Sequence, residues 1–308
     1  MPADVKHLAA RRELAQAIST VERPGAAADQ RIQVALATSA AESRHALVVG
    51  ITGAPGAGKS SLAAVLADVA RSAGRRVAIL AIDPSSHESG GALLGDRVRI
   101  DEHPDDEGRF TRSIATRGSG HSLAYVTAAA TILVEAAGFD LILVETVGAG
   151  QAEIGIARLA DVVLVVEGPE SGDEVQAMKA GILEVADIVV VNKSDRPGAQ
   201  ATFDRLRTGL ALGAGAPELL LVSASARAGI TELLTTIDEV GSRRGIRGRI
   251  RRVEAHLIAA AEAHMDAQVR EATASGALTT RAEQIVAGSA PLAGALSDLF
   301  GFSEDSDA

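Results

Sequence analysis

The sequence predicts an α/β fold in which a mostly parallel β-sheet is covered by helices on both faces. Two observations lead to this prediction. Short apolar runs rich in β-branched residues recur along the middle of the chain, and amphipathic helical patterns lie between them. The runs are continuous rather than alternating, which is typical of parallel strands buried on both faces. Strands that alternate with helices indicate a sheet that lies between two helical layers.

We predict six strands from these runs, at residues 46–52, 76–83, 140–146, 161–167, 187–192 and 218–224. Residues 1–45 have an alanine-rich helical pattern that breaks at Arg23–Ala26. From residue 247 onward the apolar residues again fall at helical spacing. The chain therefore divides into a helical N-terminal extension (1–45), an α/β domain (46–246) and a helical C-terminal arm (247–308) whose tail we expect to be disordered.

The composition argues against two kinds of partner. The 308 residues carry a net charge of −10 and only 2% aromatic residues, whereas nucleic-acid binding relies on clustered cations and stacking rings. One basic run, Arg243 to Arg252, opens a helix and is interpreted as a solvated face. No apolar run approaches the ~18 residues of a membrane-spanning helix. We therefore expect neither nucleic acid nor a membrane as a partner.

The chain contains no cysteine. Disulfides and thiolate metal sites are therefore excluded, and a reducing compartment is favoured. The first residues include Asp4 and Glu13 and lack an apolar core, so they resemble neither a signal peptide nor a transit peptide. We expect a cytoplasmic protein.

A phosphate-binding loop follows the first predicted strand. The segment GAPGAGKS matches G-x-x-x-x-G-K-[ST] and lies between a strand and a helix. Backbone N–H groups and the helix dipole can surround a phosphate, Lys59 can reach the β- and γ-phosphates, and Ser60 can ligate Mg²⁺. The alternative, a glycine-rich turn, needs a chance match of about one in a hundred. The predicted nucleotide contacts are Gly53, Ala54, Pro55, Gly56, Ala57, Gly58, Lys59, Ser60 and Ser61.

Three acidic residues are candidates to complete a magnesium site. Asp83 and Glu145 end two predicted strands, and Asp96 lies in the loop that follows Asp83. Mg²⁺ prefers hard oxygen ligands, bound directly or through water. Asp83, which precedes Pro84, could instead cap a helix.

Guanine recognition is predicted at the carboxyl end of the fifth apolar run. The segment NKSD contains Asn192, Lys193 and Asp195, and Asn192 is the only asparagine of the chain. The Asp195 carboxylate can accept from both the N1–H and the 2-amino group of guanine, a pair of donors that adenine lacks. Asn192 can bond the base edge, and the stem of Lys193 can lie against the base or ribose. The next run ends at three residues that could offer a backbone N–H to the guanine O6: Ser223, Ala224 and Ser225.

These motifs together predict a GTPase that binds GTP and GDP, and longer segments resemble the ArgK/MeaB-type GTPases. The resemblance covers residues 45 to 200 and rests on GITGAPGAGKSSL, AILAIDPSS, SGGALLGDRVRI, AAGFDLILVETVGAGQAE and GDEVQAMKAGILEVADIVVVNKSDRPGA. It implies a P-loop NTPase G domain of the SIMIBI class, a C-terminal dimerisation arm and slow GTP hydrolysis that a partner stimulates. The implied partner is an adenosylcobalamin-dependent acyl-CoA mutase such as methylmalonyl-CoA mutase. The implied role is a chaperone that gates cofactor loading and protects or reactivates the mutase.

The resemblance also carries roles over to individual residues. Lys179, in GDEVQAMK, matches a lysine in a segment that responds to the partner, and a solvent-facing helix lysine is the alternative. The implied catalytic residues are Lys59, Asp83, Glu145 and Lys179. The implied metal ligands are Ser60, Asp83, Asp96 and Glu145. An arginine finger could be any one of Arg97, Arg99, Arg109, Arg112 and Arg117.

Two segments depart from the family pattern, and two other functions stay open. Ser119–Ser122 stands where a Leu-Gly-Gly turn is expected, and Glu170–Ser171 stands where a small residue or glycine is expected. These departures leave the identity of the partner mutase open, and the candidates include relatives acting on isobutyryl-, 2-hydroxyisobutyryl- or ethylmalonyl-CoA.

A metallochaperone-type GTPase would use cysteine and histidine ligands, and the chain has no cysteine. A protein-kinase-type P-loop NTPase would use ATP, against which the guanine motif argues.

Overall fold

The computed structural model describes residues 3–23, 25–42, 45–84, 106–116, 120–146, 151–169, 185–210, 216–243 and 246–301. The C-terminal tail, for which we expect disorder, lies outside these ranges. None of the helices in the described ranges combines the length and apolarity needed to cross a membrane.

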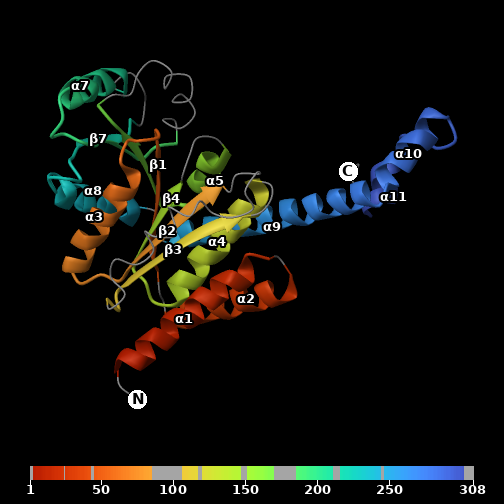
Figure 1. Cartoon of the computed structure of the whole chain (residues 1–308), viewed down its shortest axis with the longest axis horizontal. Coiled ribbons are helices and arrows are strands. Elements are labelled where there is room, and N and C mark those ends of the chain that lie inside the picture. Colours follow the sequence, from red (N-terminus) through yellow and green to blue (C-terminus); the bar gives the residue numbers. More distant parts are fainter. Residues whose placement is uncertain are drawn as a thin grey trace.

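One parallel sheet forms the centre of the molecule (Figure 1). In the described residues it has seven strands in the order β3-β2-β4-β1-β5-β6-β7, and all neighbouring strands run parallel. They are β1 (Leu47–Gly53), β2 (Val77–Pro84), β3 (Arg109–Thr116), β4 (Leu141–Thr146), β5 (Val162–Glu167), β6 (Ile188–Val191) and β7 (Glu218–Leu221). The predicted fold class and all six predicted strands are confirmed. Strand β1 lies between β4 and β5, so the phosphate loop that follows it emerges near the middle of the carboxyl edge.

Helices cover both faces of the sheet, because alternate residues of each buried strand point to opposite sides. On one face, Val49 and Ile51 of β1 belong to the same hydrophobic cluster as Leu62 and Leu66 of α3. The helices on this face are α3 (Lys59–Ser72) and α8 (Ile230–Ser242). The opposite face is covered by α4 (Gly120–Ala136), α5 (Gln151–Leu159) and α7 (Ala199–Leu210).

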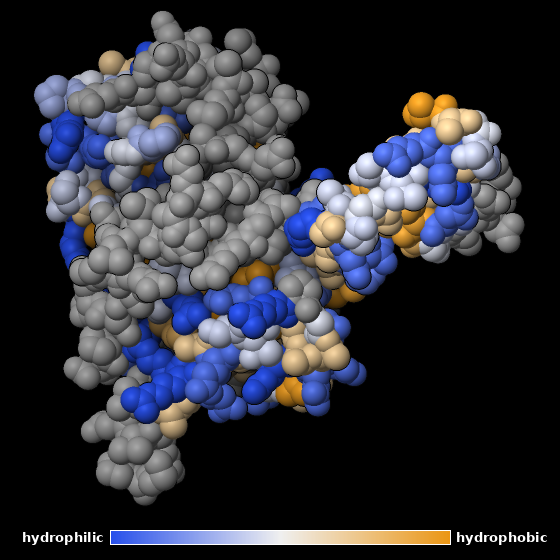
Figure 2. All heavy atoms as spheres, turned by 45° about the vertical axis from the view of Figure 1, so that its right-hand side comes forward, coloured by the Kyte–Doolittle hydropathy of each residue, from blue (hydrophilic) through white to orange (hydrophobic). Residues whose placement is uncertain are grey.

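A long helical arm leaves the body of the molecule at its C-terminal side (Figure 1). It consists of α9 (Ile246–Ala274), α10 (Ala277–Val286) and α11 (Ala295–Phe300). Only the first part of α9 packs on the body, and α10 and α11 lie at its far end. Figure 2 shows hydrophobic atoms exposed on this projecting part, where Val286 is 89%, Leu292 77% and Leu296 63% accessible.

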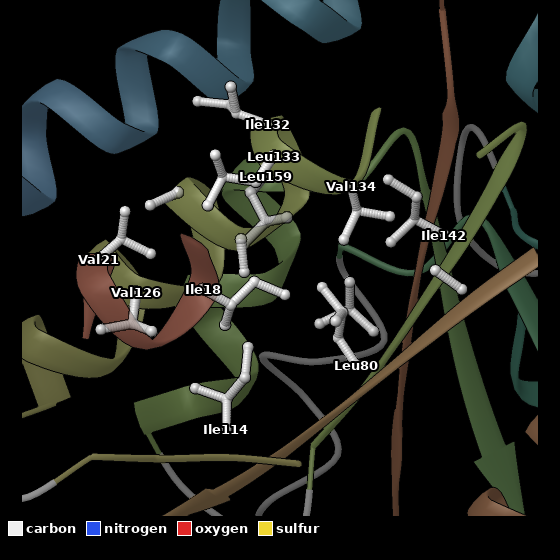
Figure 3. Close-up of a cluster of buried hydrophobic side chains, with 14 of the residues drawn as sticks. Ile18, Val21, Leu80, Ile114, Val126, Ile132, Leu133, Val134, Ile142 and Leu159 are labelled. Carbon is white, nitrogen blue, oxygen red and sulfur yellow. The ribbon is translucent and has the colours of Figure 1, made fainter. Parts of the chain in front are cut away.

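The N-terminal helices α1 (Ala3–Val21) and α2 (Ala26–Ala41) pack against α4 and share its hydrophobic cluster. Figure 3 shows how Ile18 and Val21 of α1 lie beside Val126 of α4, with Ile114 of β3 and Leu80 of β2 completing the contact. Ile18 and Val21 are fully buried. The N-terminal extension is therefore part of the same core as the sheet.

The root of the arm is joined to the body by a buried network of charges. Arg252 of α9 donates to Asp161 Oδ2 at 2.7 Å and to Glu135 Oε2 of α4 at 2.8 Å, and its side chain is 3% exposed. The interpretation of the basic run as a solvated face is therefore wrong for Arg252. A Cβ on Gly248 would lie 1.8 Å from Asp161 Oδ1, so only glycine lets α9 approach this carboxylate so closely.

One turn further along α9, His256 packs on Tyr125 of α4, with ring centroids 4.8 Å apart. The imidazole donates to the backbone carbonyl of Tyr125, while its Nδ1 is buried and has no hydrogen-bond partner among the described residues. Burial lowers the pKa of His256, and the nearby carboxylate of Asp29 on α2 only partly opposes this shift. A second proton on Nδ1 would find no acceptor among the described residues, so the folded protein favours the neutral imidazole.

Stability should therefore fall as the pH is lowered through the ordinary histidine pKa of about 6.5. The unfolded chain takes up the proton there, while the folded chain resists it. We expect the melting temperature of the wild type to fall more between pH 7.5 and 5.5 than that of His256→Gln; a difference of about 1 kcal/mol corresponds to about 2–4 °C.

The matched control for this comparison is His264→Gln, because His264 lies on the same helix and is exposed. It should keep the full pH dependence of the wild type. Identical pH profiles for the wild type and His256→Gln would contradict the prediction.

Candidate nucleotide-binding site

The turn after β1 forms the predicted phosphate loop, and its shape depends on glycine. Gly53 and Gly58 have φ values of 132° and 91°. A Cβ on Gly53 would lie 2.0 Å from the Val166 carbonyl oxygen of the neighbouring strand β5, and one on Gly58 would lie 2.6 Å from Asn192 Nδ2. Both glycines therefore permit close approaches that a side chain would prevent. The loop fits against β5 and the guanine motif because these positions lack a Cβ.

Lys59 is the first residue of α3 and is 8% exposed. Its ammonium donates to the carbonyl oxygens of Gly53 at 2.9 Å and Ala54 at 3.1 Å. The cation is thus held against the start of the loop, at the N-terminus of a helix. This is the position from which a lysine of this motif contacts the β- and γ-phosphates.

Ser60 and Glu145 meet next to this loop. The Ser60 hydroxyl donates to Glu145 Oε1 at 2.5 Å, and Glu145 is 5% exposed at the end of β4. Hydroxyl and carboxylate oxygens are the hard donors that Mg²⁺ requires, so this pair fits a magnesium ion bound directly or through water. No cluster of three or more metal-binding side chains of the His, Cys, Asp or Glu type occurs in the described part of the chain. Phosphate oxygens and water are further oxygen ligands that such an ion accepts.

Of the other two predicted metal ligands, Asp83 and Asp96, the structure describes only the backbone of Asp83. The backbone of Asp83 lies near the carboxyl end of β2, next to β4, where Ile82 is paired with Thr146. Its side chain and the whole of Asp96 lie outside the described residues.

Asn192 is 1% exposed and connects three loops. Its Nδ2 donates to the carbonyl oxygen of Ala57 at 3.0 Å, and its Oδ1 accepts from the N–H of Ala224 at 3.1 Å. Both ends of the amide therefore have a partner within the protein, and the predicted hydrogen bond from Asn192 to the edge of the base stays a prediction. The side chain therefore orients the phosphate loop and the loop after β7 relative to each other.

Lys193 adds a second contact to the phosphate loop. Its backbone is left-handed, with φ 61°, and its ammonium donates to the Gly56 carbonyl oxygen at 2.7 Å. The side chain therefore extends from its own loop to the phosphate loop, and a contact of its stem with the base or ribose stays a prediction.

Asp195 is exposed, and two hydroxyl groups fix its carboxylate. Ser223 donates to Asp195 Oδ1, and Ser225 donates to the same oxygen at 3.2 Å. The hydrogen bond from Ser223 is the main reason why the pKa of Asp195 is lowered, with a smaller contribution from Ser225. Asp195 is therefore ionised at neutral pH and can accept hydrogen bonds from the base.

The loop after β7 offers one uncommitted backbone donor. The N–H of Ser223 donates to Ala228, that of Ala224 to Asn192, and that of Ala226 to the Ser223 hydroxyl. The Ser225 N–H has no intramolecular partner among the described residues, which leaves it as the candidate donor to the guanine O6.

Two of the five candidate arginine fingers are engaged elsewhere. Arg109 pairs with Asp68 of α3 at 2.5 Å, and Arg112 donates to Ser19 and Glu22 at the end of α1. Neither side chain points to the phosphate loop. The other predicted functional positions that lie outside the described residues are Arg97, Arg99, Arg117, Lys179, Ser119 and Glu170–Ser171.

Sequence reasoning missed a buried acid at the same edge of the sheet. Glu167 ends β5, is 2% exposed, and its carbonyl oxygen accepts from the N–H of Asn192 at 2.8 Å. It follows the alternation of Val163 and Val165, so its side chain lies on the opposite face of the sheet from Glu145. The sequence did offer a signal for Glu167, because it ends the apolar run DVVLVVE as Glu145 ends another.

The chain is similar in sequence to proteins described as GTPases. The family model described as "Methylmalonyl Co-A mutase-associated GTPase MeaB" matches residues 14–279. A putative GTPase of Pyrococcus abyssi is 47% identical over 202 residues, 63% of this chain and 62% of that protein. A mouse protein named "Methylmalonic aciduria type A homolog, mitochondrial" is 37% identical over 199 residues, 62% of this chain and 48% of that protein.

Among solved structures, one titled "Crystal structure of LAO/AO transport system kinase" matches with a TM-score of 0.60 and 22% sequence identity. The match covers 97% of this chain and 98% of that chain, and at this identity it supports the fold alone. In sequence, this chain spans 62% of the length of the two Pyrococcus relatives that it matches. Because the family model accounts for residues 14–279 of the 308, the protein belongs to the MeaB family of methylmalonyl-CoA mutase-associated GTPases.

Proposed function

We propose that this protein is a Mg²⁺-dependent GTPase that acts as a chaperone for an adenosylcobalamin-dependent acyl-CoA mutase. One observation carries the GTPase part: Asn192 and Lys193 of the guanine motif contact the phosphate loop directly, so base-reading and phosphate-binding groups form one site. Membership of the MeaB family supports the mutase part, since the family description names that enzyme. The role would be to gate cofactor loading and to protect or reactivate the mutase.

Hydrolysis would proceed by direct attack of water on the γ-phosphate. Lys59 would neutralise charge on the β- and γ-phosphates, and the N–H groups of the phosphate loop would orient them. Ser60 and Glu145 would hold Mg²⁺, which when bound supplies further positive charge at the transferred phosphate. Positioning and charge stabilisation would account for catalysis, and no covalent intermediate on the protein is required.

The guanine assignment predicts the effect of Asp195→Asn. The amide cannot accept both donors of the guanine edge, but its NH₂ can donate to the 2-oxo group of xanthine. We expect GTP affinity to fall about 10- to 100-fold and xanthosine triphosphate to become the better ligand. Equilibrium binding of the two nucleotides measures this.

Asp204→Asn is the control for this substitution, because Asp204 is an aspartate paired with Arg207 on the neighbouring helix α7. It should bind GTP as the wild type does. Unchanged GTP affinity in Asp195→Asn would show that the carboxylate does not read the base.

The partner assignment predicts that GTP hydrolysis responds to a mutase. The purified protein should hydrolyse GTP slowly alone. One member of a panel of methylmalonyl-, isobutyryl-, 2-hydroxyisobutyryl- and ethylmalonyl-CoA mutases should accelerate it about tenfold, which corresponds to about 1.4 kcal/mol of barrier. If GTP binds tightly and no mutase of the panel changes the rate, the chaperone part of the proposal fails while the GTPase part stands.

A homodimer is part of the proposal and would form through the arm. Helix α10 has no buried residue, and Val286, Leu292 and Leu296 are among the most exposed large hydrophobic side chains described. Helices that bury so little in one chain usually pack against another. A second copy of this chain would cover these side chains.

Charged substitutions on the arm should therefore separate the copies. We expect Val286→Asp combined with Leu292→Asp to convert a dimer to a monomer at micromolar concentration, as measured by light scattering after size exclusion. Val34→Asp is the control, because Val34 is 60% exposed on α2 of the body. A wild type that is monomeric at the same concentration would refute the arm's role.

A further inference from the structure

Two non-glycine residues of the described chain have a left-handed backbone: Lys193, with φ 61°, and Arg227, with φ 55°. This conformation is unfavourable for a residue that has a Cβ, and such residues concentrate at functional sites. Both lie in the loops that the guanine motif and Ser223–Ser225 contribute. Both also extend a cation toward the unit formed by the phosphate loop and helix α3.

The two cations reach that unit at different points. Lys193 donates to the Gly56 carbonyl oxygen of the phosphate loop at 2.7 Å, as described above. Arg227 donates through Nη2 to Asp68 Oδ2 at 2.5 Å, in the third turn of α3. The loop after β7 is thereby attached to α3 by a contact that is separate from the Asn192 amide.

The Asp68 carboxylate that accepts from Arg227 is held in place by a second arginine. Its other oxygen, Oδ1, accepts from Arg109 at 2.5 Å, and the Arg109 side chain is 9% exposed. This pair fixes the carboxylate independently of Arg227. The Arg227 side chain, in contrast, is 58% exposed.

The backbone around Arg227 is closed into a small rigid loop. Ser223 and Ala228 exchange two backbone hydrogen bonds of 3.0 Å each, so the loop begins and ends at the same place. Ser223 and Ser225, which orient Asp195, lie in the first half of the loop, and Arg227 lies in the second. The position of Arg227 therefore affects Ser223 and Ser225, which hold the base-reading carboxylate.

Two contributions to the free energy of folding show whether Arg227 has a structural role: the gain from its ion pair and the cost of its left-handed backbone. An ion pair with a partner as exposed as Arg227 contributes little to folding, because water screens it. A left-handed backbone at a residue with a Cβ costs at least as much as such a pair contributes. The pair therefore does not account for the left-handed arginine through folding stability.

We infer that Arg227 is a positioning residue for nucleotide recognition: with Asp68 it sets the loop that holds Asp195 at a fixed distance from helix α3. This inference rests on the proposed guanine site. Arg227 does not touch the base in this arrangement. It acts through Ser223 and Ser225.

Arg227→Gly tests this because it removes the cation and relieves the backbone at once. We expect the melting temperature of the nucleotide-free protein to stay the same or rise by up to about 3 °C. Release of a fluorescent GDP analogue should nevertheless become about 2- to 5-fold faster. The preference for GDP over IDP, which lacks the 2-amino group, should fall by a similar factor.

Two further variants complete the experiment. Arg227→Lys keeps a cation and should restore part of the slow release. Arg207→Ala removes another exposed arginine that is paired with an aspartate, outside the loop, and should release nucleotide as the wild type does.

Two outcomes would overturn the inference. One is a release rate and a GDP preference that Arg227→Gly leaves unchanged. The other is a melting temperature that falls together with affinity, because that result indicates a structural role alone. A wild type that binds ADP as tightly as GDP would instead show that the guanine site itself is absent.

Discussion

The geometry of the site depends on the buried side-chain amide of Asn192. It follows β6, donates to the phosphate loop at Ala57 and accepts from Ala224 after β7, so one side chain connects three segments that are far apart in sequence. Leaving either end of a buried amide unpaired costs about 1–3 kcal/mol. The three loops are therefore held in one relative position before a nucleotide arrives. Base and phosphates meet a surface that needs little rearrangement to bind them.

The opposite edge of the same strands holds the arm. Asp161, just before β5, accepts from the Val48 N–H of β1 at 2.9 Å and from Arg252 of α9. Strand β1 therefore leads into the phosphate loop at its carboxyl end, where β5 lies beside it, and the anchor of α9 lies at the amino ends of both strands. Removing one partner from a buried ionic network of this kind costs about 3–5 kcal/mol. The root of α9 is thus anchored to the strands whose opposite ends lie at the nucleotide site.

The sequence was most informative where one local pattern determines the structure. Continuous β-branched runs predicted six strands, whereas β3 was missed because RFTRSIAT contains only two large apolar residues, Phe110 and Ile114, and pairs only with β2 at the edge. The two predicted nucleotide motifs lie side by side, because Asn192 and Lys193 both contact the phosphate loop. The buried role of Arg252 could not be predicted, since its partners Glu135 and Asp161 are 117 and 91 residues away. The internal role of Asn192 was missed for the same reason, because Ala57 is 135 residues distant.

Tyr125 is the only tyrosine of the chain, and there is no tryptophan. Its ring is 1% exposed, lies against His256 at the root of the arm, and burial raises its pKa. The tyrosine fluorescence of the protein therefore originates from a single ring at the joint between body and arm. The molecule contains its own optical probe, with which movements of this joint during nucleotide exchange can be followed without attaching a dye.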